Sequence, residues 1–95
     1  MTSEAALQRY LMRRARQHDI YARKVTAVGN TGFPDAFLVC AGRVVLVELK
    51  SPTGKGRLSV KQEREIARLR EFGINVYIVD SKEGVDNVIR NLADA

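Results

Sequence analysis

The sequence contains a single cysteine, Cys40, and a single histidine, His18. A lone cysteine cannot form an internal disulfide, and the pair cannot supply the ligand set of a structural zinc site. Cys40 stands inside the apolar run Ala36–Cys40, which is typical of a core residue. Disulfide-stabilised and zinc-stabilised small proteins are therefore excluded.

Long apolar runs are also absent, because no stretch approaches the roughly 20 residues that a membrane-spanning helix needs. The N-terminus carries an acid and arginines in place of the apolar stretch of a signal peptide. We expect no membrane association and a location in the cytoplasm. The 95 residues contain no internal repeat, linker or low-complexity tract, so we predict one domain over residues 1–95.

Negative charge is scarce relative to positive charge: 16 lysines and arginines against 11 acids give a net charge of +5. A basic surface attracts polyanions because binding releases their condensed counterions. Many basic proteins nevertheless bind no nucleic acid. Charge alone leaves open both a nucleic-acid-binding protein and a merely basic surface.

The hydrophobic pattern predicts an α/β fold with the order α-β-β-β-α-β-α. The expected elements are a helix over 3–18, strands over 20–28, 35–40 and 43–51, a helix from 59 to 73, a buried strand over 74–79 and a last helix after Ser81. Ala41-Gly42 has the spacing of a hairpin turn, and Ser3 is expected to cap the first helix. Because both faces of residues 44–47 are apolar, we expect a central strand covered on both sides.

Glu48 and Lys50 end this otherwise apolar strand. The strand period of two places both side chains on one face. Burying a carboxylate without partners costs several kcal/mol, so the two residues must be satisfied by each other or by something that the site binds. A local salt bridge and a functional site are the two interpretations.

Asp35 opens the preceding strand, and a hairpin would bring it alongside Glu48. Two carboxylates in that arrangement suit Mg²⁺ or Mn²⁺, which prefer oxygen ligands. Alternatively, Asp35 is an ordinary turn residue after Pro34.

Two further polar residues lie on helix faces that should point inward. Glu4 shares its stripe with Leu7 and Leu11, although a first-turn acid that compensates the helix dipole from solvent would look the same. Gln62 aligns with the apolar side of the second helix, but Ser59 and Gln62 also have the spacing of a capping box.

Pro34-Asp35, twelve intervening residues and Glu48-Leu49-Lys50 resemble the signature of the PD-(D/E)XK nuclease superfamily. More narrowly, the helical Glu4, the Gly-x-x-Gly-x-Pro-Asp segment over 29–35, Glu-Leu-Lys, a Gly/Lys loop and Ser-x-x-Gln resemble the VRR-NUC (virus-type replication-repair nuclease) family. The resemblance implies a single restriction-endonuclease-like core, a mixed β-sheet flanked by helices. It looks like the stand-alone form found in phages and bacteria.

The resemblance also implies roles for individual residues. Asp35 and Glu48 would bind Mg²⁺ or Mn²⁺ with the Leu49 carbonyl, and Glu4 would complete or orient the metal shell. Lys50 would orient or help deprotonate the attacking water, and Gln62 would hold that water or Lys50. Two residues of the loop after the strand, Lys55 and Arg57, are suited to contacts with backbone phosphates.

We therefore expect a metal-dependent, structure-selective DNA endonuclease that acts at four-way (Holliday) junctions as a homodimer. A nuclease acting on flaps, nicks or single strands is an alternative. The alternative from another class is a catalytically silent nucleic-acid-binding module.

Overall fold

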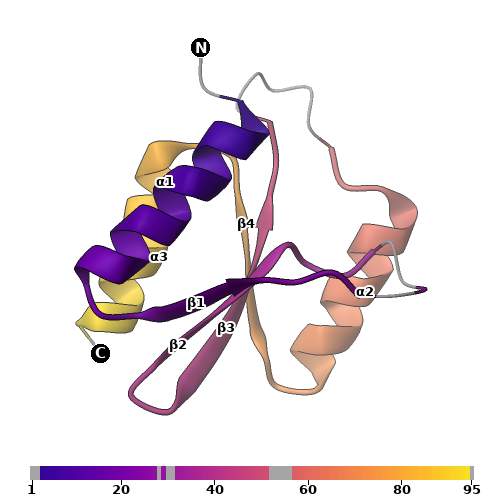
Figure 1. Ribbon diagram of the computed structural model, residues 1–95. Helices are drawn as coiled ribbons and strands as arrows, with labels where there is room; N and C mark the ends of the chain where they lie inside the picture. Colours follow the sequence, from indigo (N-terminus) through magenta and orange to yellow (C-terminus); the bar gives the residue numbers. More distant parts are fainter. Residues whose placement is uncertain (1–2, 28, 30–31, 52–56, 95) are drawn as a thin grey trace.

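The computed structural model describes residues 3–27, 29, 32–51 and 57–94. Its elements are α1 (Glu4–Gln17), β1 (Tyr21–Lys24), β2 (Ala36–Cys40), β3 (Arg43–Leu49), α2 (Val60–Glu71), β4 (Asn75–Val79) and α3 (Lys82–Ala93) (Figure 1). This is the predicted α-β-β-β-α-β-α order.

The strands form a mixed sheet in the order β1-β2-β3-β4. The pairs β1–β2 and β2–β3 are antiparallel, and β3 and β4 are parallel, with α2 as the crossover between them. Helices α1 and α3 lie against one face of the sheet and α2 against the other (Figure 1). The central position predicted for the third strand is confirmed.

Three sequence-based expectations are corrected. The first strand is shorter than predicted and ends at Lys24, although the Val25 N–H still donates to the Asp35 carbonyl at 2.8 Å. The strand β4 is only half buried, with Ile78 44% exposed, because β4 is an edge of the sheet. Val44 is 42% exposed, so β3 is covered on both faces only from Val45 onward.

Each face of the sheet has its own apolar cluster. The larger one joins residues of α1, the sheet and α3, and includes Leu7, Leu11, Ala15, Leu38, Val47, Val85, Val88, Ile89 and Leu92. The smaller one places Ile66 of α2 against Leu46 and Val76. The apolar residues of α1 and α3 are thus packed in the core. This packing fixes the position of the N-terminus of α1 relative to β3.

The predicted helix starts are confirmed by their caps. Ser3 Oγ accepts from the Ala6 N–H at 3.0 Å, and Ser81 Oγ accepts from the Gly84 N–H at 3.0 Å. Such caps satisfy N–H groups that have no partner within the helix. In the described part of the chain, no helix is long and apolar enough to cross a membrane.

Candidate active site

Glu48 and Lys50 form a buried ion pair at the end of the central strand. Glu48 is 1% exposed, and its Oε2 lies 3.3 Å from Lys50 Nζ. Lys50 follows β3 directly, and its backbone N–H donates to the Val79 carbonyl at 2.8 Å, which holds the chain against β4. The expected placement of both side chains on one face is confirmed.

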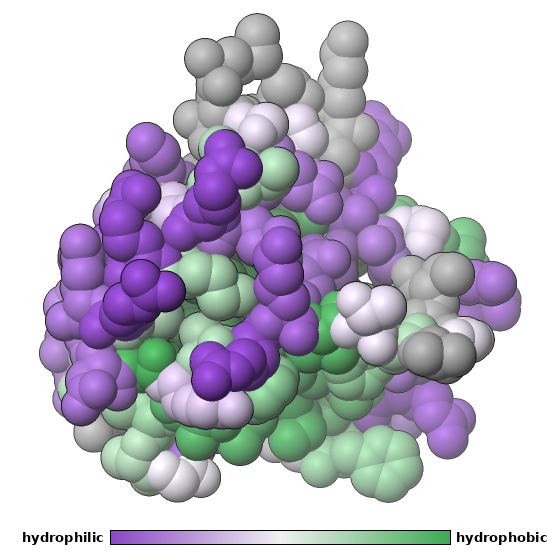
Figure 2. All heavy atoms as spheres, viewed as in Figure 1, coloured by the Kyte–Doolittle hydropathy of each residue, from purple (hydrophilic) through white to green (hydrophobic). Residues whose placement is uncertain are grey.

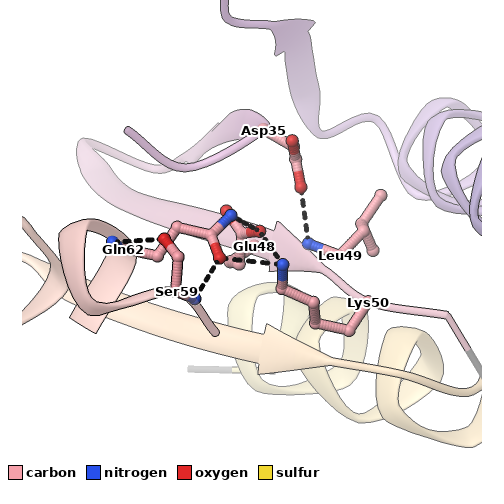
Figure 3. A network of polar contacts seen from close by, with 6 residues as sticks. All are labelled: Asp35, Glu48, Leu49, Lys50, Ser59 and Gln62. Carbon is pink, nitrogen blue, oxygen red and sulfur yellow. Dashed lines mark hydrogen bonds and ion pairs between the residues drawn. The ribbon is translucent and has the colours of Figure 1, made fainter. Parts of the chain in front are cut away.

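Gln62 of α2 connects this ion pair to the start of its helix (Figure 3). Its Nε2 donates to Glu48 Oε2 at 3.0 Å, and its Oε1 accepts from Lys50 Nζ at 2.9 Å. The same Oε1 accepts from the Ser59 N–H at 2.8 Å, completing a capping box. The capping box is therefore confirmed, and the same side chain also contacts Glu48 and Lys50, whereas its role in an active site stays a prediction.

Asp35 lies at the same end of the sheet as Glu48 (Figure 3). Its backbone N–H donates to the Val47 carbonyl at 3.0 Å, which continues the antiparallel pairing of β2 with β3. Its Oδ2 accepts from the Leu49 N–H at 2.7 Å. The hairpin thus brings Asp35 beside the chain segment that carries Glu48 and Lys50, as predicted.

The glycines before Asp35 have separate physical reasons. Gly29 has a φ of +78°, a conformation that residues with a Cβ rarely adopt. At Gly32 a Cβ would lie 2.7 Å from the carbonyl oxygen of Lys61 in the first turn of α2. Only glycine permits this approach, so the segment leading to Asp35 lies directly against the helix that carries Gln62.

The environment of Glu48 disfavours the ionised form of its carboxyl group. Burial, followed by the charge of Asp35, raises the pKa of Glu48 from 4.5 to about 7, although Lys50 acts in the opposite direction. Its Oε1 is buried and has no hydrogen-bond partner among the described residues. An unpartnered carboxylate oxygen beside a second carboxylate fits a bound cation, whose charge would satisfy both.

Glu4 was expected to point inward, but its side chain is exposed, so the expectation that it is buried is wrong. It nevertheless lines a hollow of about 290 Å³ together with Ala5, Gln8, Asp35 and Leu49. No group of three acidic, histidine or cysteine residues in the described ranges is close enough to form a metal site. Glu4 therefore does not join Asp35 and Glu48 as a preassembled third ligand, and its metal role stays a prediction.

Gln8 is the residue of this hollow that the sequence interpretation missed. It lies one helical turn after Glu4, and that i, i+4 spacing is the signal that identifies it. Of the two predicted phosphate-binding residues, Arg57 is exposed and Lys55 lies outside the described residues.

Comparisons with known proteins identify the family to which this fold belongs. The family model of the VRR-NUC domain matches residues 3–83. A solved structure titled "VRR_NUC domain" is 30% identical in sequence and superposes with a TM-score of 0.82, over 95% of this chain and 97% of that one. No curated protein sequence matches. The predicted nuclease-type α/β fold is confirmed, and the chain belongs to the VRR-NUC family.

Proposed function

We propose that the protein is a divalent-metal-dependent endonuclease that hydrolyses phosphodiester bonds of DNA. The observation that carries this proposal is Glu48, whose buried and unpartnered Oε1 lies in a site shared with Asp35 and Lys50. An acid pair beside the DNA backbone would repel phosphate unless a cation neutralises it. Family membership supports a nuclease over other uses of such a site.

The donor set suits Mg²⁺ or Mn²⁺. The carboxylates of Asp35 and Glu48 and the carbonyl oxygen of Leu49 would hold the cation, and Glu4 would complete its shell across the hollow that it shares with Asp35. The chemistry that such a cation supplies is charge stabilisation at the phosphate and a lowered pKa of water.

Lys50 is the proposed catalytic residue that is not itself a ligand of the metal. Its ammonium carries three N–H donors, and Gln62 Oε1 and Glu48 Oε2 hold it from one side. The remaining N–H would orient the attacking water by donating to its oxygen and stabilise the negative charge on the phosphate. To help deprotonate that water instead, Lys50 would act as the neutral amine, whose Nζ accepts the proton. Gln62 is a positioning residue, because it acts through Lys50 and Glu48.

We propose branched DNA, in particular a four-way junction, as the substrate and a homodimer as the active form. Phosphate contacts dominate what a basic chain of 95 residues can make, whereas sequence readout requires an element that enters a groove. Lys55 and Arg57, as expected from the sequence, would contribute contacts to backbone phosphates. A dimer would present two equivalent sites to a junction with matching approximate symmetry.

The deciding experiment incubates the protein with labelled linear, flapped and four-way DNA, with Mn²⁺ or with chelator. We expect cleavage only with metal, and its loss in Asp35→Ala, Glu48→Ala and Lys50→Ala variants that remain folded by circular dichroism. Full activity in chelator, or in Glu48→Ala, would overturn the mechanism. Preferred cleavage of flaps or single strands would retain the mechanism and replace the junction as substrate.

A catalytically silent DNA-binding module is the alternative from another class. A binding module gains nothing from a buried carboxylate whose pKa is raised to about 7. DNA binding without any metal-dependent cleavage of all three substrates would favour this alternative.

A further inference from the structure

A second hollow lies between the C-terminal half of α1 and the edge strand β1. Its volume is about 660 Å³, and its lining consists of Met12, Arg16, Asp19, Ile20, Tyr21, Ala22, Arg23 and Lys24. Three of these residues are cationic and one is acidic. The hollow shares no lining residue with the one that Glu4 and Asp35 line, and the catalytic proposal makes no use of it.

The same two elements connect this hollow to the active site. Helix α1 contributes Glu4 and Gln8 to the active-site hollow and, two to three turns later, Met12 and Arg16 to the second hollow. At the other wall, Lys24 pairs with Ala36, and the next N–H of the chain donates to the Asp35 carbonyl at 2.8 Å. The two hollows therefore follow one another along α1 and β1, starting at Asp35.

The distance of each β1 residue from the active site can be compared with the spacing of phosphates in DNA. A strand rises about 3.3 Å per residue, so Tyr21 lies roughly 10 Å along the strand from the end that meets Asp35. One strand of a DNA duplex advances about 3.4 Å along the helix axis per phosphate. Arg23 and Lys24 lie nearer than Tyr21, within roughly 7 Å of the residue that bonds Asp35. The basic part of β1 is thus about one to two nucleotides from the site.

The side chain of Arg23 in β1 is already held in one position, which favours the binding of an anion. The guanidinium of Arg23 lies 4.2 Å from the centroid of the Tyr21 ring and donates to the Ala22 carbonyl at 2.8 Å. Tyr21 is 51% exposed, so this stacked pair faces solvent. An arginine fixed in this way loses less side-chain entropy when its other N–H donors bind a phosphate.

A second copy of the chain is a poorer occupant of this edge. Among the strands that the structure describes, β1 pairs only with β2, so none of them lies along its other edge. Pairing with another β1 would bring Arg23 and Lys24 close to their own counterparts, and basic side chains on an edge strand oppose such pairing. The same charges complement a polyanion. Hydrophilic residues cover much of the face seen in Figure 2, in which α1 and β1 lie toward the viewer.

We propose that this hollow binds the DNA backbone, with Arg16, Arg23 and Lys24 as the phosphate contacts. Arg23 and Lys24 would contact phosphates about one to two nucleotides from the scissile phosphate, and Arg16 one farther along the hollow. The inference rests on the proposed nuclease function. It identifies the surface along which the DNA backbone continues beyond the active site. It concerns binding, so it is testable in the absence of cleavage.

The first test measures binding of a fluorescent DNA duplex by anisotropy, in chelator and over a series of salt concentrations. Replacing Arg16 and Arg23 by Gln is expected to flatten the slope of log K against log salt by about 1.8, because each lost phosphate contact contributes about 0.9. The matched control replaces Arg64 and Arg68, two exposed arginines of α2 that line neither of the two hollows. The control removes equal charge and should change the slope much less.

The second test places single neutral methylphosphonates along the DNA. Substitutions about two nucleotides from the cut should weaken binding of the wild type but not of Arg23→Gln, which has already lost that contact. Equal slopes in the α1–β1 variant and the α2 control, or equal sensitivity of both proteins to those methylphosphonates, would overturn the inference. A wild type that binds DNA through this surface but never cuts it would reject the nuclease proposal alone, and one that binds no DNA would reject both.

Discussion

The side-chain oxygen of Gln62 lies 2.9 Å from Lys50 Nζ and also accepts from the Ser59 N–H at 2.8 Å. Because both donors point at this oxygen, the NH₂ group of Gln62 faces Glu48 Oε2. One amide therefore closes the cap of α2 and orients the two charged residues at the end of β3. The start of α2 and the active site are consequently one structural unit.

The cap and the site can be separated by two substitutions. Ser59→Ala removes only the hydroxyl that accepts from the Gln62 N–H at 3.1 Å, and we expect a loss of about 1 kcal/mol in unfolding free energy with the cleavage rate nearly unchanged. Gln62→Ala also releases Lys50 and Glu48, and we expect the rate to fall about 10- to 100-fold. Urea unfolding and single-turnover cleavage measure the two effects, and equal rates in both variants would contradict the positioning role.

A second prediction concerns stability and pH. The pKa of Glu48 is raised to about 7 in the folded protein from 4.5. Between these values the folded state binds a proton that the unfolded state has released, so stability falls as pH rises through this window. The full loss in the metal-free protein is about 3 kcal/mol, and it is complete above pH 7.

Glu48→Gln isolates this contribution from the other titrating groups. The variant cannot ionise at this position, so in chelator it should become more stable than the wild type as pH rises from 4.5 to 8. Thermal or urea unfolding at several pH values measures the difference between the two proteins. Saturating Mn²⁺ should reduce or reverse it, because a cation favours the ionised carboxylate. A difference that stays constant with pH would show that Glu48 is not perturbed.

Much of the fold was predictable because its signals are local. The apolar stripe of Leu7, Leu11 and Ala15 sets the face of α1, and the period of two along β3 places Glu48 and Lys50 together. Ala41-Gly42 takes positive φ values of 52° and 79°, as a tight hairpin connection requires.

Other features depend on contacts between distant segments, which no local pattern contains. A helical wheel gives the direction of Glu4 but not the depth of its neighbours, so the hollow beside Asp35 was not predictable. The approach of Gly32 to Lys61 joins a loop to a helix 29 positions later. Gln62 presented two rival interpretations because sequence spacing cannot show one oxygen accepting from two donors.

The third prediction compares the two glycines before Asp35. Gly32→Ala places a methyl group 2.7 Å from the Lys61 carbonyl oxygen, so backbone must move. We expect a loss of about 1–3 kcal/mol in stability, together with a fall in cleavage rate as the segment carrying Asp35 shifts. Gly29→Ala is the control, because its φ of +78° imposes strain but its Cβ would meet no atom within 4 Å. Gly29→Ala should lose about 1–2 kcal/mol and keep its rate when folded; equal rates in the two folded variants would refute the close-approach argument.

The fourth prediction concerns Glu4 and metal affinity. Its carboxylate lines the same hollow as Asp35, so Glu4→Ala should weaken Mn²⁺ binding in calorimetry, with the larger effect at low salt because the carboxylate is exposed. Gln8→Ala, which changes the same hollow without changing charge, is the matched control. Unchanged affinity and rate in Glu4→Ala would reduce Glu4 to an acid that compensates the dipole of α1.

The fifth prediction is a symmetric homodimer that cuts both strands of a junction. Two copies double the net charge from +5 to +10, which strengthens attraction to a junction where several backbones converge. The apolar face of α3 cannot be the interface, because Val85, Val88, Ile89 and Leu92 are at most 2% exposed. If the protein is a homodimer, light scattering at micromolar concentration should give twice the chain mass of 10.6 kDa.

Mixing wild-type subunits with Glu48→Ala subunits tests whether the two sites of the dimer act together. A mixed dimer has one active site, so it should nick a cruciform plasmid on one strand only, and an excess of the variant should convert linear product into nicked circles. Independent monomers would predict a different result, because the variant would then slow the reaction only by competing for DNA, and an unrelated DNA-binding competitor would have the same effect. Pre-incubation long enough for subunit exchange should strengthen the shift toward nicked circles, whereas mixing immediately before the reaction should not. A monomeric mass, or a product ratio that is independent of pre-incubation and matches simple competition, would reject the dimer while leaving the site at Asp35, Glu48 and Lys50 intact.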